Sequence, residues 1–333
     1  MIYNYAIQPE CLFAQNGLWH HHKDLGIASG RVIAEVAGGN WRETAEKHLA
    51  AIYHTIGMRG HRKLDEWLCN LAKSGTFRRR PIDPRTPESS DWISAVREAN
   101  QRHPFSAIVS ENQDQFPECT NVINKLDVDL AHSLWYVPRG VLVKRQVDSI
   151  ACALRPLAEI SQDLLFVEPY FALQTQAFGA IAKVIVESQN ESYPLRNVEV
   201  HTELKDGQTL SSGVENIRDC FSALMRKHKI SSHQPNFKVM FRTKLHDRFF
   251  LTELGGIKLS AGFGEAKKPD QEADLLTEQQ WLHRWREYNT REMDYVEAPT
   301  SRASLCGAVD AEFELDCQSA RVVALKQTSA RQR

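Results

Sequence analysis

The sequence predicts an α/β protein in which a mainly helical region, residues 1–150, precedes an α/β domain, residues 151–300, whose mixed sheet is flanked by helices. Three observations predict it. Apolar residues recur three and four apart in the first region, strand-like and helix-like segments alternate in the second, and the composition (42% hydrophobic, 25% charged) is ordinary for a globular protein. Residues 301–333 have weak periodicity, which predicts a partly frayed tail.

The helical expectation for the first region rests on its apolar spacing. Between Trp41 and Ile56 the apolar residues follow the period of an amphipathic helix. Gly57 and Gly60 mark a break, after which the same spacing continues to Leu71. Only a short run near residues 107–110 reads as a strand in this region.

In the second region the period changes from one segment to the next. Helices are expected within 141–164 and at 175–187, 214–228 and 275–288, and strands at 164–170, 197–202, 237–242, around 246–253 and at 257–260. The first of these strands is a continuous apolar run, as in a buried strand. Strands that alternate with helices of this length imply right-handed crossovers and a mixed sheet covered by helices.

Charge and composition exclude several classes of function. The net charge of −1 provides no global basic field for nucleic acid, so any such contact must come from a local patch. No apolar run reaches the roughly 18 residues of a membrane span, and the N-terminus lacks the basic and apolar regions of a secretion signal. Seven cysteines without a Cys-x-x-Cys pair predict reduced thiols in the cytoplasm. We expect no cofactor and no metal, since the adjacent His20–His22 read as solvated loop residues.

The segment from Lys244 to Glu253 carries the most chemical information. It reads as a strand, and side chains two apart on a strand share a face. His246 and Arg248 are therefore expected to converge on one anionic group, while Phe249 packs on the other face. A histidine beside a fixed cation is what phosphodiester chemistry requires.

Residues 160–290 resemble one half of a phospholipase D-like (HKD) domain. The family signature is His-x-Lys, four residues, Asp and then a Gly-Ser turn. Here the corresponding residues are His246-x-Arg248, four residues and Glu253, with Ser260-Ala-Gly262 near the turn. The spacing is kept, but Arg248 replaces the lysine, Glu253 replaces the aspartate and Ser260-Ala-Gly262 replaces the Gly-Ser turn. The motif is therefore more similar to the degenerate domains of this superfamily, such as the C-terminal domain of MIT-domain proteins. The strand end Glu168-Pro169-Tyr170 is also similar to the Asp-Pro-Tyr strand end seen in such domains.

The resemblance implies roles for the motif residues. His246 would be the nucleophile, Arg248 the phosphate clamp and Glu253 the carboxylate that orients the histidine, with Lys244 and Ser260 as further phosphate-binding residues. One motif is half of an active site. His21-x-Lys23 and His61-x-Lys63 both lack a carboxylate five residues after the lysine, so an active enzyme would require a homodimer that joins two copies of His246.

A second basic cluster lies far from this motif. Arg78, Arg79 and Arg80 stand in a stretch rich in Pro and Arg, up to Pro87, which reads as an exposed loop. They are candidates for contact with a nucleic-acid backbone. The alternative is a solvated loop without a ligand.

Several functions therefore stay open. The first is a phosphodiester- or nucleic-acid-binding protein with no membrane partner, which by analogy with soluble single-motif relatives would belong to a bacterial phage-defence system. The second is a homodimeric, metal-independent phosphodiesterase or nuclease that uses His246. The third is a non-catalytic protein-interaction domain, with the helical region as partner surface. In each non-catalytic case His246-Asp247-Arg248 has a structural or binding role only.

Overall fold

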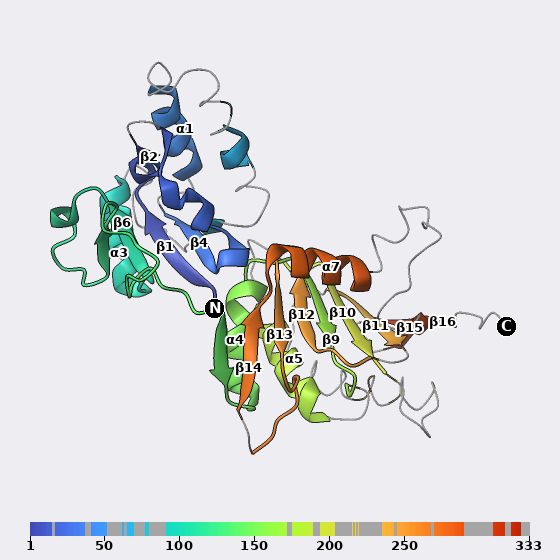
Figure 1. Ribbon diagram of the computed structural model, residues 1–333. Coiled ribbons are helices and arrows are strands. Elements are labelled where there is room, and N and C mark those ends of the chain that lie inside the picture. The colour runs from blue at the N-terminus through green and yellow to red at the C-terminus, as the bar shows by residue number, and fades with distance from the viewer. Residues whose placement is uncertain are drawn as a thin grey trace. The chain divides into compact units, whose positions relative to one another are not determined.

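In the computed structural model the chain forms two compact units, Met1–Arg139 (unit 1) and Gly140–Arg333 (unit 2) (Figure 1). The α/β class that the sequence predicts is confirmed, since both units contain strands and helices. The structure describes residues 1–14, 17–36, 41–51, 62, 65–69, 77–79, 91–171, 175–188, 194–203, 215, 217, 219, 235–242, 245–267, 270–289, 309–316 and 321–327.

Unit 1 is built on a sheet of five parallel strands in the order β5-β4-β1-β6-β7. The strands are β1 (Tyr3–Ile7), β4 (Arg31–Glu35), β5 (Phe77–Arg79), β6 (Ala107–Ser110) and β7 (Val122–Asn124). The expectation of a mainly helical first region was therefore wrong. These strands are short, and β4 and β6 are buried on both faces, so they show no polar alternation that the sequence could reveal.

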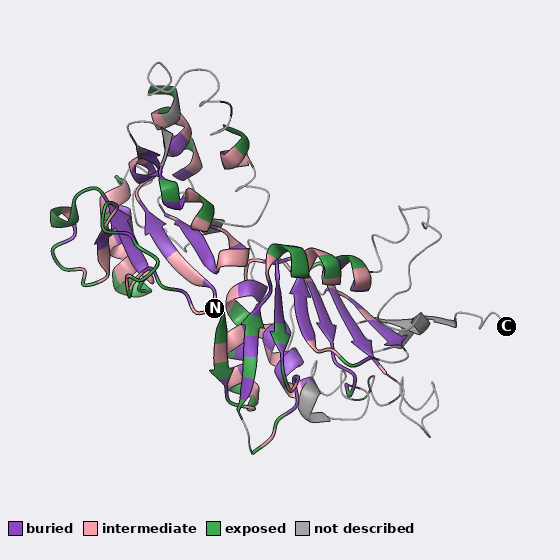
Figure 2. Cartoon of the chain, in the orientation of Figure 1, coloured by how far each residue is buried: buried purple, intermediate pink, exposed green. Residues whose placement is uncertain are grey.

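Helices cover both faces of this sheet. The α1 helix (Trp41–Ala51) packs Trp41 into a core with Tyr5 and Ile7, whereas α3 (Trp92–Arg102) packs Val96 against Ala6 on the other face. Figure 2 shows the buried strands between exposed helix faces. The remaining described elements are η1 (Pro9–Leu12), β2 (Phe13–Ala14), β3 (Gly17–Leu18), η2 (His20–Asp24), η3 (Ile27–Ser29) and η4 (Gln113–Gln115).

Unit 2 contains a nine-stranded sheet in the order β16-β15-β11-β10-β9-β12-β13-β14-β8. Its strands are β8 (Gly140–Val143), β9 (Asp163–Val167), β10 (Asn197–Thr202), β11 (Asn236–Arg242), β12 (Phe249–Thr252), β13 (Gly256–Leu259), β14 (Gln271–Leu275), β15 (Val309–Asp316) and β16 (Arg321–Gln327). The strands β9, β10 and β11 are parallel and the other pairings are antiparallel, so the expected mixed sheet is confirmed.

Two expected boundaries differ from the structure. Strand β8 pairs with β14, so the second unit begins at Gly140 and its sheet includes residues before 151. The segment expected as a frayed tail forms the hairpin β15–β16, and β15 extends the sheet beside β11. Backbone pairing with a strand already in place orders this segment despite its weak periodicity.

The two faces of this sheet have different covers (Figure 1). The α7 helix (Glu278–Tyr288) packs Trp285 and Tyr288 on Leu165, Val167 and the face of β12 that carries Phe249. The alternate residue Phe166 contacts Phe250 and Phe263 on the opposite face, where α4 (Val147–Ala158) and α5 (Thr175–Glu187) pack together. In the described part of the chain, no helix combines the length and apolar character that crossing a membrane requires.

Candidate anion-binding site

The site lies where β9 ends and β12 begins. These strands are antiparallel with Val167 opposite Phe249. Glu168, which follows Val167, and Arg248, which precedes Phe249, are therefore brought to the same edge of the sheet. Val167 and Phe249 face α7, so the side chains of their neighbours Glu168 and Arg248 point to the opposite face of the sheet.

Glu168 is the buried centre of this site, with 2% of its surface exposed. One carboxylate oxygen accepts a hydrogen bond from the amide of Tyr170 (3.1 Å) and the other from the amide of Phe263 (3.0 Å). Burial raises the pKa of Glu168, while these amides and the charges of Arg248 and Arg145 act in the opposite direction. The carboxylate is thus held by backbone donors rather than by an arginine.

The loop between β13 and β14 completes the cradle around Glu168. Gly262 has φ +89°, and a Cβ atom there would lie 2.3 Å from Oε2 of Glu168 and 2.6 Å from Cδ of Arg248. Only glycine allows both side chains to approach the backbone so closely. The buried Gln271 holds the loop, because its amide donates to the carbonyl of Gly262 (2.9 Å) and its oxygen accepts from the amide of Ala261 (3.1 Å).

Two arginines at this site have unsatisfied donors. The Nε atoms of Arg145 and Arg248 are buried and have no hydrogen-bond partner in the described part of the chain. By contrast, the Nε atoms of Arg31 and Arg242 donate to a carbonyl and a histidine, at 3.2 and 2.6 Å. Buried polar groups are normally satisfied, because an unpaired one costs about 1–3 kcal/mol.

The electrostatic balance of the site is positive. Both guanidinium groups interact with Glu168, and one positive charge remains when this carboxylate is ionised. A planar guanidinium with free donors binds phosphate or carboxylate oxygens well. Both arginines are partly exposed, so an oxyanion can bind the outer donors of their guanidinium groups, whereas the buried Nε atoms would meet it only after a side-chain movement.

Tyr170 forms the outer wall of the site. The guanidinium carbon of Arg248 lies 5.6 Å from the centre of its ring, in the range of a cation–π contact. The residue as a whole is 37% exposed. The site therefore combines a cationic interior with an accessible aromatic surface.

The structure separates the residues of the His-x-Arg motif. His246 is exposed, whereas Asp247 forms an ion pair with Arg284 of α7 (3.1 Å). Arg248 alone enters the site described above. All three residues precede β12 rather than lying within it, so the shared strand face expected for His246 and Arg248 is not formed by regular strand pairing. Lys244 lies outside the described residues.

Glu253 and Ser260 have structural partners. The carboxylate of Glu253 accepts from the backbone amides of Gln162 (2.7 Å) and Asp163 (3.0 Å), where β9 begins. This places it at the opposite end of β12 from His246, and burial raises its pKa. The hydroxyl of Ser260 accepts from the amide of Glu272 (3.0 Å) and joins β13 to β14.

The arginine cluster belongs to unit 1. Arg78 and Arg79 lie in the edge strand β5, opposite Ala34 and Glu35, where an exposed loop was expected. Backbone pairing with β4 forms a strand just before the prolines that predicted a loop. Arg80 lies outside the described residues.

Arg145, Glu168 and Tyr170 were not assigned as site residues from the sequence. Arg145 precedes α4 and has no motif around it. The available signal was Glu168, a carboxylate directly after the apolar run 164–167, because a buried carboxylate requires nearby donors or cations. One of its donors, the amide of Tyr170, is local, whereas the other, the amide of Phe263, lies 95 positions away.

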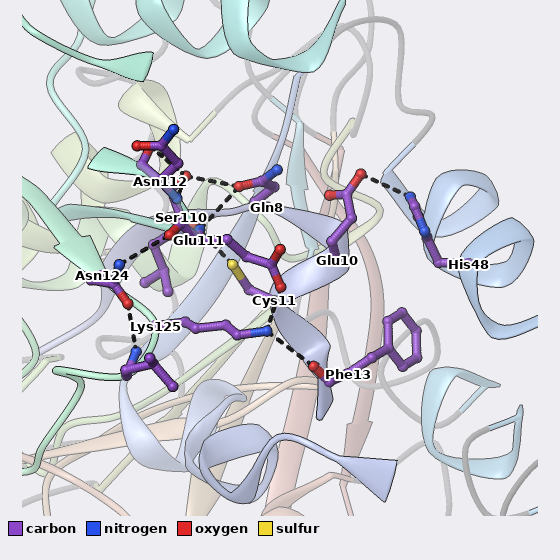
Figure 3. A network of polar contacts seen from close by, with 12 residues as sticks. Gln8, Glu10, Cys11, Phe13, His48, Ser110, Glu111, Asn112, Asn124 and Lys125 are labelled. Carbon is purple, nitrogen blue, oxygen red and sulfur yellow. Dashed lines mark hydrogen bonds and ion pairs between the residues drawn. The ribbon is translucent and has the colours of Figure 1, made fainter. Parts of the chain in front are cut away.

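A second polar network lies at the carboxyl ends of the strands of unit 1 (Figure 3). The side-chain oxygen of Gln8 accepts from the hydroxyl of Ser110 (2.8 Å) and from the amide of Glu111 (3.2 Å). Lys125 pairs with Glu111 and donates to the carbonyl of Phe13 (3.2 Å). These groups satisfy one another and connect the loops that follow β1, β6 and β7.

The parallel core of unit 2 contains a buried polar chain. Arg242 donates to Nδ1 of His201 (2.6 Å), and Nε2 of His201 lies 2.7 Å from Glu199. His201 has no exposed surface, and burial lowers its pKa. The neutral ring accepts from the arginine and donates to the carboxylate. Its complete burial fits a role in packing β10 and β11 beneath Tyr288 of α7.

The middle residue of the histidine triplet, His21, has a structural role, whereas His20 is exposed as expected. His21 is buried rather than solvated, pairs with Asp24 (2.7 Å) and packs on Trp19 and Trp135. Across the residues that the structure describes, no group of three His, Cys, Asp or Glu side chains is arranged to hold a metal ion.

Comparison with known proteins gives limited similarity. No family model and no curated protein sequence matches the chain. Among the solved structures that match the chain, two are similar over about half of it. Polyphosphate kinase from Porphyromonas gingivalis has 15% identity and a TM-score of 0.31, with 49% of this chain and 27% of that chain covered. TrmBL2, an archaeal chromatin protein described as showing a novel mode of DNA binding, has 7% identity and a TM-score of 0.26, with coverage of 50% and 56%. The chain thus spans less than two thirds of either protein, and scores this low carry no functional conclusion.

Proposed function

We propose that unit 2 is a phospholipase D-like domain that binds phosphodiester anions of nucleic acid and no longer cleaves them. The observation that carries this proposal is the pair of arginines, Arg145 and Arg248, whose buried Nε donors lack acceptors beside the buried Glu168. A phosphodiester carries a negative charge and several acceptor oxygens, which are the groups that these donors require.

The placement of the other motif residues supports binding without catalysis. An HKD nucleophile needs an orienting carboxylate, and Glu253 is occupied at the start of β9. His246 is exposed, whereas phosphoryl transfer depends on a closely positioned nucleophile. The same exposure leaves His246 accessible to a second copy of the chain, so a homodimeric nuclease is the second candidate.

Binding of a labelled single-stranded oligonucleotide, followed by fluorescence anisotropy over a range of salt concentrations, tests the proposal. We expect Arg248→Gln and Arg145→Gln each to weaken binding by about 10- to 150-fold, the equivalent of the roughly 1.5–3 kcal/mol of a hydrogen bond to a charged group. Each should also reduce the salt slope by about 0.7. The matched control is Arg155→Gln on α4, since Arg155 already pairs with Glu159 (3.4 Å).

Cleavage assays in EDTA separate the candidates. Binding without cleavage, unchanged by His246→Ala, supports the proposal. Cleavage that His246→Ala abolishes, in a protein whose mass by light scattering is that of a dimer, would establish the nuclease instead. Absence of oligonucleotide binding would refute the proposal and leave the protein-interaction domain. The expected role in phage defence depends on this binding and stays a prediction.

A further inference from the structure

Tyr170 differs from the other aromatic side chains of the site. Phe166, Phe250 and Phe263 are buried, whereas Tyr170 has 37% of its surface exposed. Its position is fixed, because its backbone amide donates to Glu168 (3.1 Å) and its ring contacts Arg248. The exposed ring is thus a rigid part of the anion site rather than a side chain on a separate surface.

This arrangement places two kinds of recognition side by side. The guanidinium groups of Arg145 and Arg248 attract an oxyanion, and the adjacent ring of Tyr170 offers a surface for stacking. A nucleotide carries a phosphate and a flat base separated by one sugar. A phosphate held by the arginines would therefore bring a base within reach of Tyr170.

The surroundings favour a single strand over a duplex. A base in a duplex is covered by its stacked neighbours, so only an unpaired base offers a free face to an aromatic side chain. Duplex binding relies on many phosphate contacts along a basic surface, whereas this chain has a net charge of −1, and β14 exposes Glu272 and Asp274. One clamped phosphate and one stacked base suit a single strand.

We propose that unit 2 recognises single-stranded nucleic acid by stacking one base on Tyr170 while Arg145 and Arg248 hold its phosphate. This inference rests on the proposed function, since it requires phosphodiester binding at the same arginines. It adds a requirement for the base, which phosphate binding alone lacks.

The test compares three labelled probes of equal length: an oligothymidylate, the same backbone made of abasic residues, and a duplex. We expect oligothymidylate to bind the wild type roughly 5- to 150-fold more tightly than the abasic probe, the range of one stacked base. Tyr170→Ala should remove that difference and Tyr170→Phe should retain it. The control is Tyr136→Ala, which removes an exposed tyrosine of unit 1 (60% exposed).

Each outcome has a defined reading. Equal affinity for oligothymidylate and the abasic probe, still dependent on Arg248, would overturn the stacking inference and leave the phosphodiester-binding function intact. Tighter binding of the duplex than of the single strand would also overturn it. Absence of binding to all three probes would refute the proposed function itself.

Discussion

Replacing Gly262 by alanine is expected to damage the anion site and the stability of unit 2 together. The added Cβ atom would lie 2.3 Å from Oε2 of Glu168, 2.6 Å from Cδ of Arg248 and 3.0 Å from its Nε. The carboxylate cannot move freely, because it is buried and its Oε2 accepts from the amide of Phe263 (3.0 Å).

The magnitude follows from two terms. An L-residue at φ +89° costs about 1–3 kcal/mol in backbone strain. Displacing Glu168 from the Phe263 amide leaves a buried donor unsatisfied, which costs about 1–3 kcal/mol. The free energy of unfolding of unit 2 should therefore fall by about 2–6 kcal/mol, the sum of the two terms.

Gly140→Ala is a matched control. Its Cβ would lie 2.2 Å from Oδ1 of Asp274, a distance as short as the one at Gly262. Asp274 is exposed, and its carboxylate can rotate away into solvent. Alanine also reduces the freedom of the unfolded chain at an ordinary φ, so the change should stay within about 1 kcal/mol.

Urea unfolding and hydrogen exchange measure the difference. Exchange of peptides covering 163–171 and 245–263 assigns the loss to unit 2, which matters because the chain has two units and its unfolding need not be a single step. Oligonucleotide affinity should fall in Gly262→Ala, since Arg248 is displaced. If Gly262→Ala lost no more stability than Gly140→Ala, the close packing of Glu168 and Arg248 on this backbone would be refuted.

Three further predictions concern buried ionisable groups. Because burial raises the pKa of Glu168 above its ordinary 4.5, stability of the wild type relative to Glu168→Gln should fall as the pH rises above 4.5; a pH-independent difference in urea midpoint would contradict this. Because burial lowers the pKa of His201 below 6.5, the wild type should lose stability below pH 6.5 by up to about 1.4 kcal/mol per pH unit. Urea titrations at pH 7.5, 6.5 and 5.5 would measure this slope, which should be absent from His201→Gln. Glu253→Ala leaves two backbone donors unpaired and should cost about 1–3 kcal/mol of stability without changing oligonucleotide affinity; weaker binding at unchanged stability would restore a role at the site.

The sequence predicts unit 2 better than unit 1 for a physical reason. The hairpin of β12 and β13 is local, and its Gly255-Gly256 turn stands between two apolar runs. In unit 1, β1 pairs with β4 and β6, which lie about 30 and 100 residues away. Parallel pairing between distant segments leaves no turn signal in the sequence. The apolar spacing of three and four residues therefore predicted helices for unit 1, and the strands were missed.

The candidate site shows the same limit. The His-x-Arg spacing draws attention to Arg248, which lies beside Glu168 in the candidate site. It cannot reveal that Glu253 reaches back to the start of β9, because Glu253 follows β12 whereas His246 lies before that strand, at its other end. Arg145 joins the site only through the pairing of distant strands, so no local pattern could identify it.

Strand β8 has a consequence for how the chain folds during synthesis. Its partner β14 is made long after it, whereas all pairings among the strands of unit 1 are available once Asn124 has left the ribosome. Because domains fold in order from the N-terminus, unit 1 can fold before β14 has been synthesised. Until then β8 has no partner strand, and it carries Leu142, which is 74% exposed even in the folded chain. A nascent or truncated chain that ends before Gln271 would present this apolar edge to other chains, and it should aggregate or engage a chaperone.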